Sequence, residues 1–299
     1  METGTDSLDA LAWLLDSGAD EACGDEPVNR FTARASIPPP LAGGGEARSA
    51  SGEGLRQPPP PDLSRNSAIN RPPPPGGREK LIADSSPASD HIGRAMEIAA
   101  ACNSLVELKT ALENFDGSAL KKLATNTVFA DGTPSRHIMF IGEAPGRDED
   151  RAGLPFVGRA GKLLDKMLAA IGLDRATNAY ITNVLNWRPP DNRDPSPEEA
   201  AMCLPFLRRH IELVAPEIII LLGAVAARHV LGKTDGIMRL RGKWLEYHVG
   251  GHMIPVMPTL HPAYLLRQPA HKKLAWRDLQ MISDKIKSLR LLEMNSAGD

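Results

Sequence analysis

Residues 142–150 read "GEAPGRDED" and place four carboxylates beside a turn rich in glycine and proline. A phosphate-binding loop requires a Gly-rich backbone with Lys and Ser/Thr at fixed spacing, whereas here Pro145 removes a backbone donor and acidic residues follow it. A metal site formed by these carboxylates is a second interpretation, but the nearby histidines lack paired ligand spacing. The third interpretation, which we favour, is a catalytic loop that uses its carboxylates as acids or bases.

The elements that must position this loop alternate along the chain. Apolar runs that predict strands lie at 137–142, 179–185, 217–223 and in the hairpin pattern 243–260. Helical patterns lie between and after them at 158–172, 196–216, 224–232 and 273–292. Alternation of this kind predicts an α/β fold with a mostly parallel sheet.

Three polar stretches follow predicted strands, namely 142–150, 183–193 and 261–267. Ligands of open α/β sheets bind beyond the carboxyl ends of the strands, so these stretches are expected to meet in one crevice. Carboxylates, the aromatic Phe156, the amide Asn183 and the histidine His261 would then lie together. That combination suits cleavage of an N-glycosidic bond to a base that is flipped out, stacked and read by an amide.

The N-terminal region differs in composition from the rest of the chain. Residues 1–90 hold 13 of the 26 prolines and 10 of the 26 glycines, so we predict a disordered linker over 20–88. Residues 1–19 include "DSLDALAWLLDS", which predicts a short helix that either binds a partner or packs on the domain. The folded catalytic domain is expected over 89–293, followed by a flexible tail over 294–299.

Charge and cysteine content limit the possible settings. Residues 1–90 carry a net charge of −6 and the remainder +4, which is compatible with nucleic-acid binding but does not require it. Three cysteines suit a reducing compartment. The chain lacks an apolar run of about 18 residues and a basic N-terminal leader, so a cytoplasmic protein is expected.

Four stretches resemble those of the family 4 uracil-DNA glycosylases, in the same order over about residues 118–292: "GEAPGRDED", "GLPFVGRAGKLLDKML", "YITNVLNWRPPDNR" and "HPAYLLR". The resemblance implies a three-layer sandwich around a central, mostly parallel four-stranded sheet. It also implies a monomeric DNA repair enzyme that hydrolyses uracil from DNA in base-excision repair. Two other interpretations stay open: a DNA-binding module that has lost turnover and recruits partners through its tail, and a Rossmann-like nucleotide-binding enzyme.

The resemblance also assigns roles to residues. Of the two glutamates, we favour Glu149 as the residue that orients water and Glu143 as an organiser of the loop, although the resemblance does not settle which is which. His261 would stabilise the departing uracil, and the uracil-binding residues would be Ala144, Phe156 and Asn183. From their positions alone, and not from the resemblance, Arg147, Arg188, Arg193 and Arg267 are expected to contact DNA phosphates. Either Leu265 or Leu266 is expected to insert into the base stack where the flipped nucleotide leaves it. Asp148 and Asp150 are expected to be solvated.

One departure from that family concerns its iron–sulfur cluster, which relatives usually hold on four cysteines. The matching positions in this chain are Phe115, Ser118, Trp187 and Cys203, so one cysteine remains. Because a cluster needs its full set of thiolates, we predict that no metal cofactor is bound. Phe115 and Trp187 are expected to pack near Cys203 and to fill the space with apolar side chains.

Overall fold

The computed structural model describes residues 87–134 and 138–292. The segments predicted for 1–19 and 294–299 lie outside these residues, as does the linker up to residue 86. The first described element is helix α2 (Pro87–Ala101), which begins two residues before the predicted domain boundary. No helix within the described residues is long and apolar enough to cross a membrane.

Six strands within the described ranges form one mixed sheet in the order β1-β3-β2-β4-β6-β5. The central four are parallel, as predicted: β3 (Tyr180–Asn183), β2 (Ile138–Gly142), β4 (Ile218–Leu222) and β6 (His252–Thr259). Antiparallel strands extend both edges, namely β1 (Ala130–Gly132) beside β3 and β5 (Leu245–Val249) beside β6. The sequence does not reveal β1, because a three-residue half-buried strand has no hydrophobic alternation.

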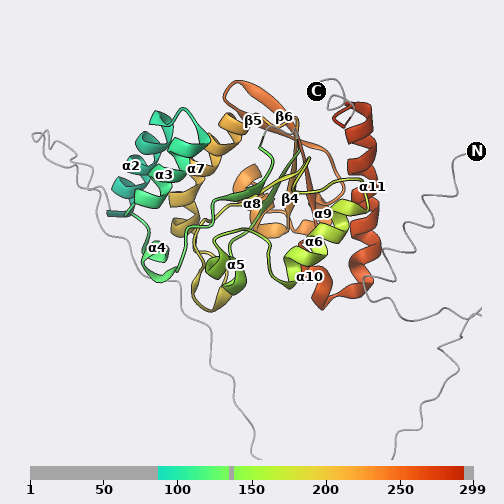
Figure 1. Ribbon diagram of the computed structural model, residues 1–299, viewed down its shortest axis with the longest axis horizontal. Coiled ribbons are helices and arrows are strands. Elements are labelled where there is room, and N and C mark those ends of the chain that lie inside the picture. Colours follow the sequence, from blue (N-terminus) through green and yellow to red (C-terminus); the bar gives the residue numbers. More distant parts are fainter. Residues whose placement is uncertain (1–86, 135–137, 293–299) are drawn as a thin grey trace, which may run out of the picture. The chain divides into compact units, whose positions relative to one another are not determined.

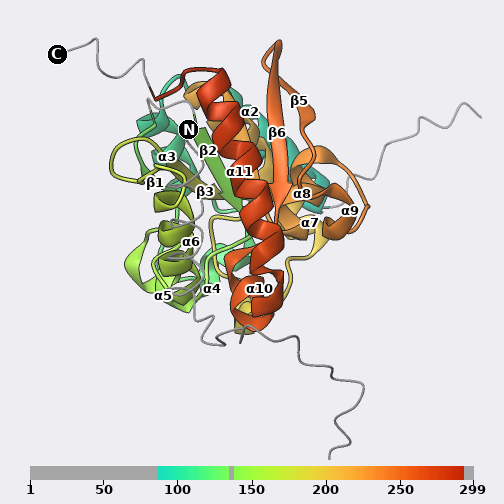
Figure 2. The same cartoon turned by 90° about the vertical axis from the view of Figure 1, so that its right-hand side faces the viewer.

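Helices cover both faces of this sheet (Figures 1 and 2). One face carries α2, α3 (Leu105–Asn114), α7 (Pro197–Val214) and α8 (Ala224–Leu231). The other carries α6 (Arg159–Ala169), α10 (Pro262–Arg267) and α11 (Lys272–Ser288). Side chains of β2 alternate between the two cores: Met139 and Ile141 enter the first, Ile138 and Phe140 the second. The predicted three-layer sandwich is therefore confirmed.

Short helical segments complete the connections. These are α4 (Ala119–Leu123), α5 (Arg147–Ala152), η1 (Pro190–Asn192), α9 (Ile237–Leu240) and η2 (Pro269–His271). Two of them, α5 and η1, lie in the polar stretches that follow β2 and β3, so these stretches are folded rather than open loops.

The start of α7 fixes the polar stretch that precedes it. Ser196 Oγ accepts a hydrogen bond from the Glu199 amide (3.2 Å), and Glu199 Oε2 accepts one from the Ser196 amide (2.8 Å). This is the capping box that the sequence predicts, with Pro197 at the first helical position. Arg193 donates two further bonds to the Glu199 carboxylate, so the chain before the helix is tied to the cap.

Three of the four positions that match cluster ligands lie in the first core. Phe115, Trp187 and Cys203 are at most 1% exposed and belong to one hydrophobic core. Phe115 meets Phe206 edge to face with ring centroids 5.2 Å apart, and the indole N–H of Trp187 donates to Thr127 Oγ1 (3.0 Å). Burial raises the pKa of the Cys203 thiol to about 12, so this thiol stays protonated at neutral pH. These side chains are packed as ordinary core residues.

We predict that Trp187→Ala lowers the free energy of unfolding by about 3–5 kcal/mol, because it opens a large cavity in a fully buried site. Urea denaturation measures this loss. The control is Leu123→Ala, whose side chain is 67% exposed and should change stability by less than about 0.5 kcal/mol. A loss below about 1 kcal/mol for Trp187→Ala would show that the indole does not support the core.

Candidate active site

A cleft of about 510 Å³ opens at the carboxyl ends of the parallel strands. Residues from all three polar stretches line it together with Phe156, as expected from the sequence: Glu143, Ala144, Glu149, Asn183, Arg193, His261 and Arg267. The volume lies within the range of small-molecule sites. The cleft is therefore large enough for a ligand the size of a base or nucleoside.

Phe156 forms one wall of the cleft in an unusual backbone conformation. Its φ is 54°, a left-handed value that costs a residue other than glycine about 1–3 kcal/mol. Its ring lies 5.5 Å from the His261 ring at an interplanar angle of 31°. Glycine is needed at two neighbouring positions, because a Cβ would lie 2.5 Å from Phe156 Cζ at Gly142 and 1.7 Å from the Phe156 carbonyl oxygen at Gly161.

Asn183 ends β3 and faces the cleft with an unpaired acceptor. Its side chain is 2% exposed, and its Oδ1 atom has no hydrogen-bond partner among the described residues. Leaving a buried acceptor unpaired costs about 1–3 kcal/mol, so such an atom favours a ligand that brings an N–H donor. Gly142 lies directly against this oxygen, where a Cβ would come within 2.4 Å.

His261 caps the N-terminus of α10 and is held as a neutral donor. Its Nδ1 atom accepts a hydrogen bond from the Ala263 amide (3.1 Å), so the proton of the neutral ring lies on Nε2. Burial, followed by the positive charge of Arg267, lowers the pKa of His261 to about 4. At pH 7 the ring therefore carries one N–H and no charge.

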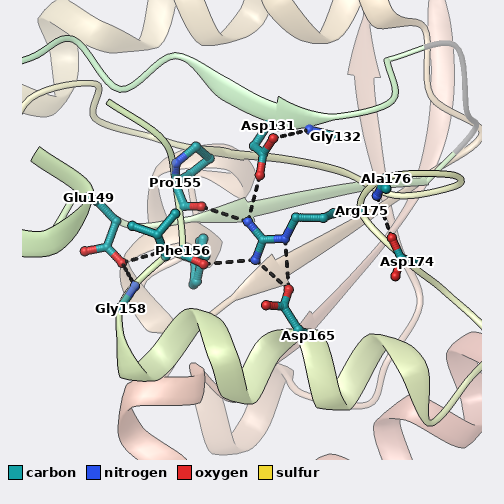
Figure 3. Close-up of polar contacts among 11 residues, drawn as sticks. Asp131, Gly132, Glu149, Pro155, Phe156, Gly158, Asp165, Asp174, Arg175 and Ala176 are labelled. Carbon is teal, nitrogen blue, oxygen red and sulfur yellow. Dashed lines mark hydrogen bonds and ion pairs between the residues drawn. The ribbon is translucent and has the colours of Figure 1, made fainter. Parts of the chain in front are cut away.

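The two glutamates of the loop have different surroundings, and Figure 3 shows those of Glu149 beside Phe156 and Gly158. Glu149 accepts three backbone hydrogen bonds, from Val157 (3.1 Å) and Gly158 (2.9 Å) at Oε1 and from Gly146 (3.1 Å) at Oε2. It joins the loop after β2 to the turn that carries Phe156. Both glutamates line the cleft, but at Glu143 burial, followed by the charge of Asp194, raises the pKa to about 7.

The other two carboxylates of the loop do not lie together. Asp148 is exposed, as expected. Asp150 is only 7% exposed, and its Oδ1 accepts from the amides of Thr125 (2.8 Å) and Asn126 (3.2 Å), so the expectation of a solvated side chain is wrong. Among the described residues no three His, Cys, Asp or Glu side chains are placed to hold a metal ion together.

Arginines gather in a smaller depression of about 280 Å³ beside the cleft, which is lined in part by Arg147, Arg159 and Arg188. Arg188 also donates to Asn192 Oδ1 (2.7 Å). Arg159 is a candidate that the sequence interpretation missed, because the first residue of a helix gives no sign of the surface it will face. Arg193 differs from these arginines, because its guanidinium is already engaged by Glu199.

The two leucines of α10 separate into core and surface. Leu265 is fully buried in the second core, whereas Leu266 is 37% exposed. Leu266 lines a shallow hollow together with Arg159 and Arg267. The suggestion that either leucine inserts into DNA is therefore restricted to Leu266, because Leu265 is held by the protein core.

Known proteins match the part of the chain that forms the sheet and the cleft. A model of the uracil DNA glycosylase superfamily matches residues 129–280. The chain is 44% identical over 169 residues to the type-4 uracil-DNA glycosylase of Archaeoglobus fulgidus, covering 55% of this chain and 84% of that protein. It is 42% identical over 166 residues to that of Thermotoga maritima, covering 54% and 84%. A type-5 uracil-DNA glycosylase of Pyrobaculum aerophilum is 32% identical over 114 residues, covering 33% and 50%.

We predict that Glu143→Gln stabilises the protein at pH 8 but not at pH 4. The folded-state pKa of about 7 lies above the ordinary value of 4.5, so the unfolded chain holds fewer protons between these values and wild-type stability falls as pH rises through this window. Glutamine does not ionise and avoids this loss. The gain at pH 8 should be about 1–2 kcal/mol after allowance for partial exposure, measured by urea denaturation.

Glu149→Gln provides the matched comparison. Its carboxylate accepts three backbone hydrogen bonds, so this substitution should destabilise the protein at pH 8 by about 1.5–3 kcal/mol. Equal effects of the two substitutions would contradict the different surroundings described for the two glutamates.

Proposed function

Because the chain belongs to the uracil DNA glycosylase superfamily, we propose that it hydrolyses the bond between uracil and deoxyribose in DNA. The product is an abasic site, the starting point of base-excision repair. The residues that line the cleft supply the three functions this reaction needs: selection of the base, activation of water and stabilisation of the leaving group.

The unpaired Oδ1 of Asn183 is the observation that carries this proposal. Uracil presents an N3–H donor beside the O4 acceptor, and one side-chain amide can accept from the first and donate to the second. Cytosine presents the opposite pattern and would leave buried polar groups unpaired. A base read in this way would stack on Phe156, with the backbone amide of Ala144 at its edge.

The surroundings of the glutamates support Glu143, rather than the initially favoured Glu149, as the residue that orients water. A group with a pKa of about 7 is matched to proton transfer at neutral pH, whereas the Glu149 carboxylate is occupied by backbone amides. The water oxygen bonds to C1′ as the C1′–N1 bond breaks, and Glu143 takes the water proton. The uracil leaves as an anion, which the Nε2–H of His261 stabilises at O2.

DNA would lie across the rim of the cleft. Phosphates would be contacted by Arg147, Arg159, Arg188 and Arg267, and Leu266 would fill the space that the flipped nucleotide leaves. The two described cysteines, Cys102 and Cys203, are free and buried, which supports a reducing compartment such as the cytoplasm.

The function is tested with an oligonucleotide that contains one uracil. Incubation followed by alkali should cleave the strand at that position, and the matching thymine oligonucleotide should stay intact. Tight binding without cleavage would instead support the alternative of a DNA-binding module that has lost turnover.

We further propose that the protein works without an iron–sulfur cluster. The residues that match the four ligands do not fit that cofactor, because the sites of three thiolates hold Phe115, Ser118 and Trp187. We expect the protein purified without oxygen to be colourless, with less than about 0.1 iron per chain by elemental analysis. A brown protein with about four irons per chain would contradict this proposal.

We predict that Asn183→Asp relaxes the selectivity for uracil over cytosine by about 10–100-fold, since about 1–3 kcal/mol of discrimination comes from one good pair of polar contacts. A protonated carboxyl can accept from the cytosine amino group, which the wild-type amide opposes. Single-turnover excision from uracil and cytosine oligonucleotides measures the ratio.

Asn183→Ala is the control for this prediction. It removes the amide without offering a new hydrogen-bonding pattern, so uracil excision should fall and cytosine excision should not rise. An unchanged preference in Asn183→Asp would remove Asn183 from the role of reader.

A further inference from the structure

Arg175 lies in the connection between α6 and β3, outside the cleft, and all five of its N–H groups are used (Figure 3). Nε and Nη2 donate to Asp165 Oδ1 (2.9 and 2.6 Å), and Nη1 donates to Asp131 Oδ2 (2.8 Å). The remaining two N–H groups reach the backbone of the Phe156 turn: Nη1 donates to the Pro155 carbonyl (3.1 Å) and Nη2 to the Phe156 carbonyl (2.9 Å).

These two bonds meet the chain where it is strained. They fix the Pro155 and Phe156 carbonyls, which lie before and after the Phe156 Cα atom. Phe156 is the residue with the left-handed φ of 54°. Glu149 fixes the next two amides, of Val157 and Gly158. A strained conformation persists only when its surroundings over-determine it, and here a guanidinium holds the carbonyls while a carboxylate holds the amides.

We propose that Arg175 is a positioning residue for uracil excision, which acts by holding the Phe156 turn so that the aromatic ring stays in the cleft. This inference rests on the proposed function. Arg175 does not line the cleft, so it acts through Phe156 and not on the substrate. Asp131 on β1 and Asp165 on α6 in turn hold the guanidinium, which connects the turn to two elements of the fold.

A lysine cannot replace this group. Its ammonium has three donors at one point, whereas the observed pattern needs five donors spread over a planar fork. Arg175→Lys therefore keeps the charge near both aspartates but loses the simultaneous contact with two successive carbonyls. This separates a positioning role from the simple neutralisation of two carboxylates.

The experiment is a double-mutant cycle with Phe156→Gly, which removes the ring and accepts a positive φ without strain. Arg175→Lys should lower the single-turnover rate of uracil excision by about 10–100-fold when Phe156 is present, since small misplacements cost about that much. In the Phe156→Gly background the same change should alter the rate less than about twofold. An equal loss in both backgrounds would overturn the proposal.

Arg209→Lys is the matched control, because Arg209 is similarly half-buried, pairs with Glu212 and donates to the Cys102 carbonyl away from the cleft. It should leave the excision rate unchanged in both backgrounds. If Arg175→Lys does not fold, Asp165→Asn is the substitute variant. It weakens the two hydrogen bonds that Arg175 donates to Asp165, and the Asp165 side chain is exposed, so the change is tolerated more easily. A rate loss for Asp165→Asn that does not depend on Phe156 would equally overturn the proposal.

Thermal unfolding of the same variants tests whether Arg175 holds the Phe156 turn, without reference to activity. Arg175→Lys should lower Tm by about 4–8 °C with Phe156 present and by less than half of that with glycine. Should the wild-type chain excise no uracil, the proposed function fails, and equal Tm losses in both backgrounds would show that Arg175 does not hold the turn.

Discussion

The turn at residues 155–158 is the constraint on which the site depends, because it must hold an aromatic ring over the ends of β2 and β3 in a backbone conformation that aromatic residues avoid. Gly142 and Gly161 leave room for the ring and for the carbonyl oxygen. The Glu149 carboxylate accepts hydrogen bonds from amides of the turn, and the Arg175 guanidinium donates hydrogen bonds to its carbonyls. The strain is thus opposed by charge-assisted hydrogen bonds, which are about twice as strong as neutral ones.

Burial sets the protonation states of the titratable side chains in the cleft. It raises the pKa of Glu143 and lowers that of His261, and the common cause is that a site poor in water disfavours both charged forms. At pH 7 the cleft therefore contains the Glu143 carboxyl group, whose pKa is about 7, and the neutral imidazole of His261. A neutral N–H donor suits an anionic leaving group, because it stabilises the negative charge that develops in the reaction. A charged imidazolium would instead pair with a nearby carboxylate before the reaction begins.

The first core shows how this chain supports the same fold with few cysteines. Phe115 and Trp187 occupy positions that bear thiolates in the family it resembles, and both are fully buried. Trp187 lies in the same polar stretch as Asn183, and the Cys203 thiol interacts with the backbone of Asn186, the residue before Trp187. Packing in this core therefore also holds the chain just after β3, the strand that ends at Asn183.

The sequence by itself determined the four parallel strands, the capping box of α7 and the meeting of three polar stretches, because these follow from local periodicity and from the polarity of parallel sheets. Only the tertiary structure distinguished the surroundings of Glu143 from those of Glu149. It alone also showed that Leu265 and Asp150 are buried whereas Leu266 and Asp148 are exposed. It alone revealed Arg175, whose bond to Asp131 joins residues 44 positions apart. Desolvation and long-range hydrogen bonds decide these roles, and neither leaves a periodic signal in the sequence.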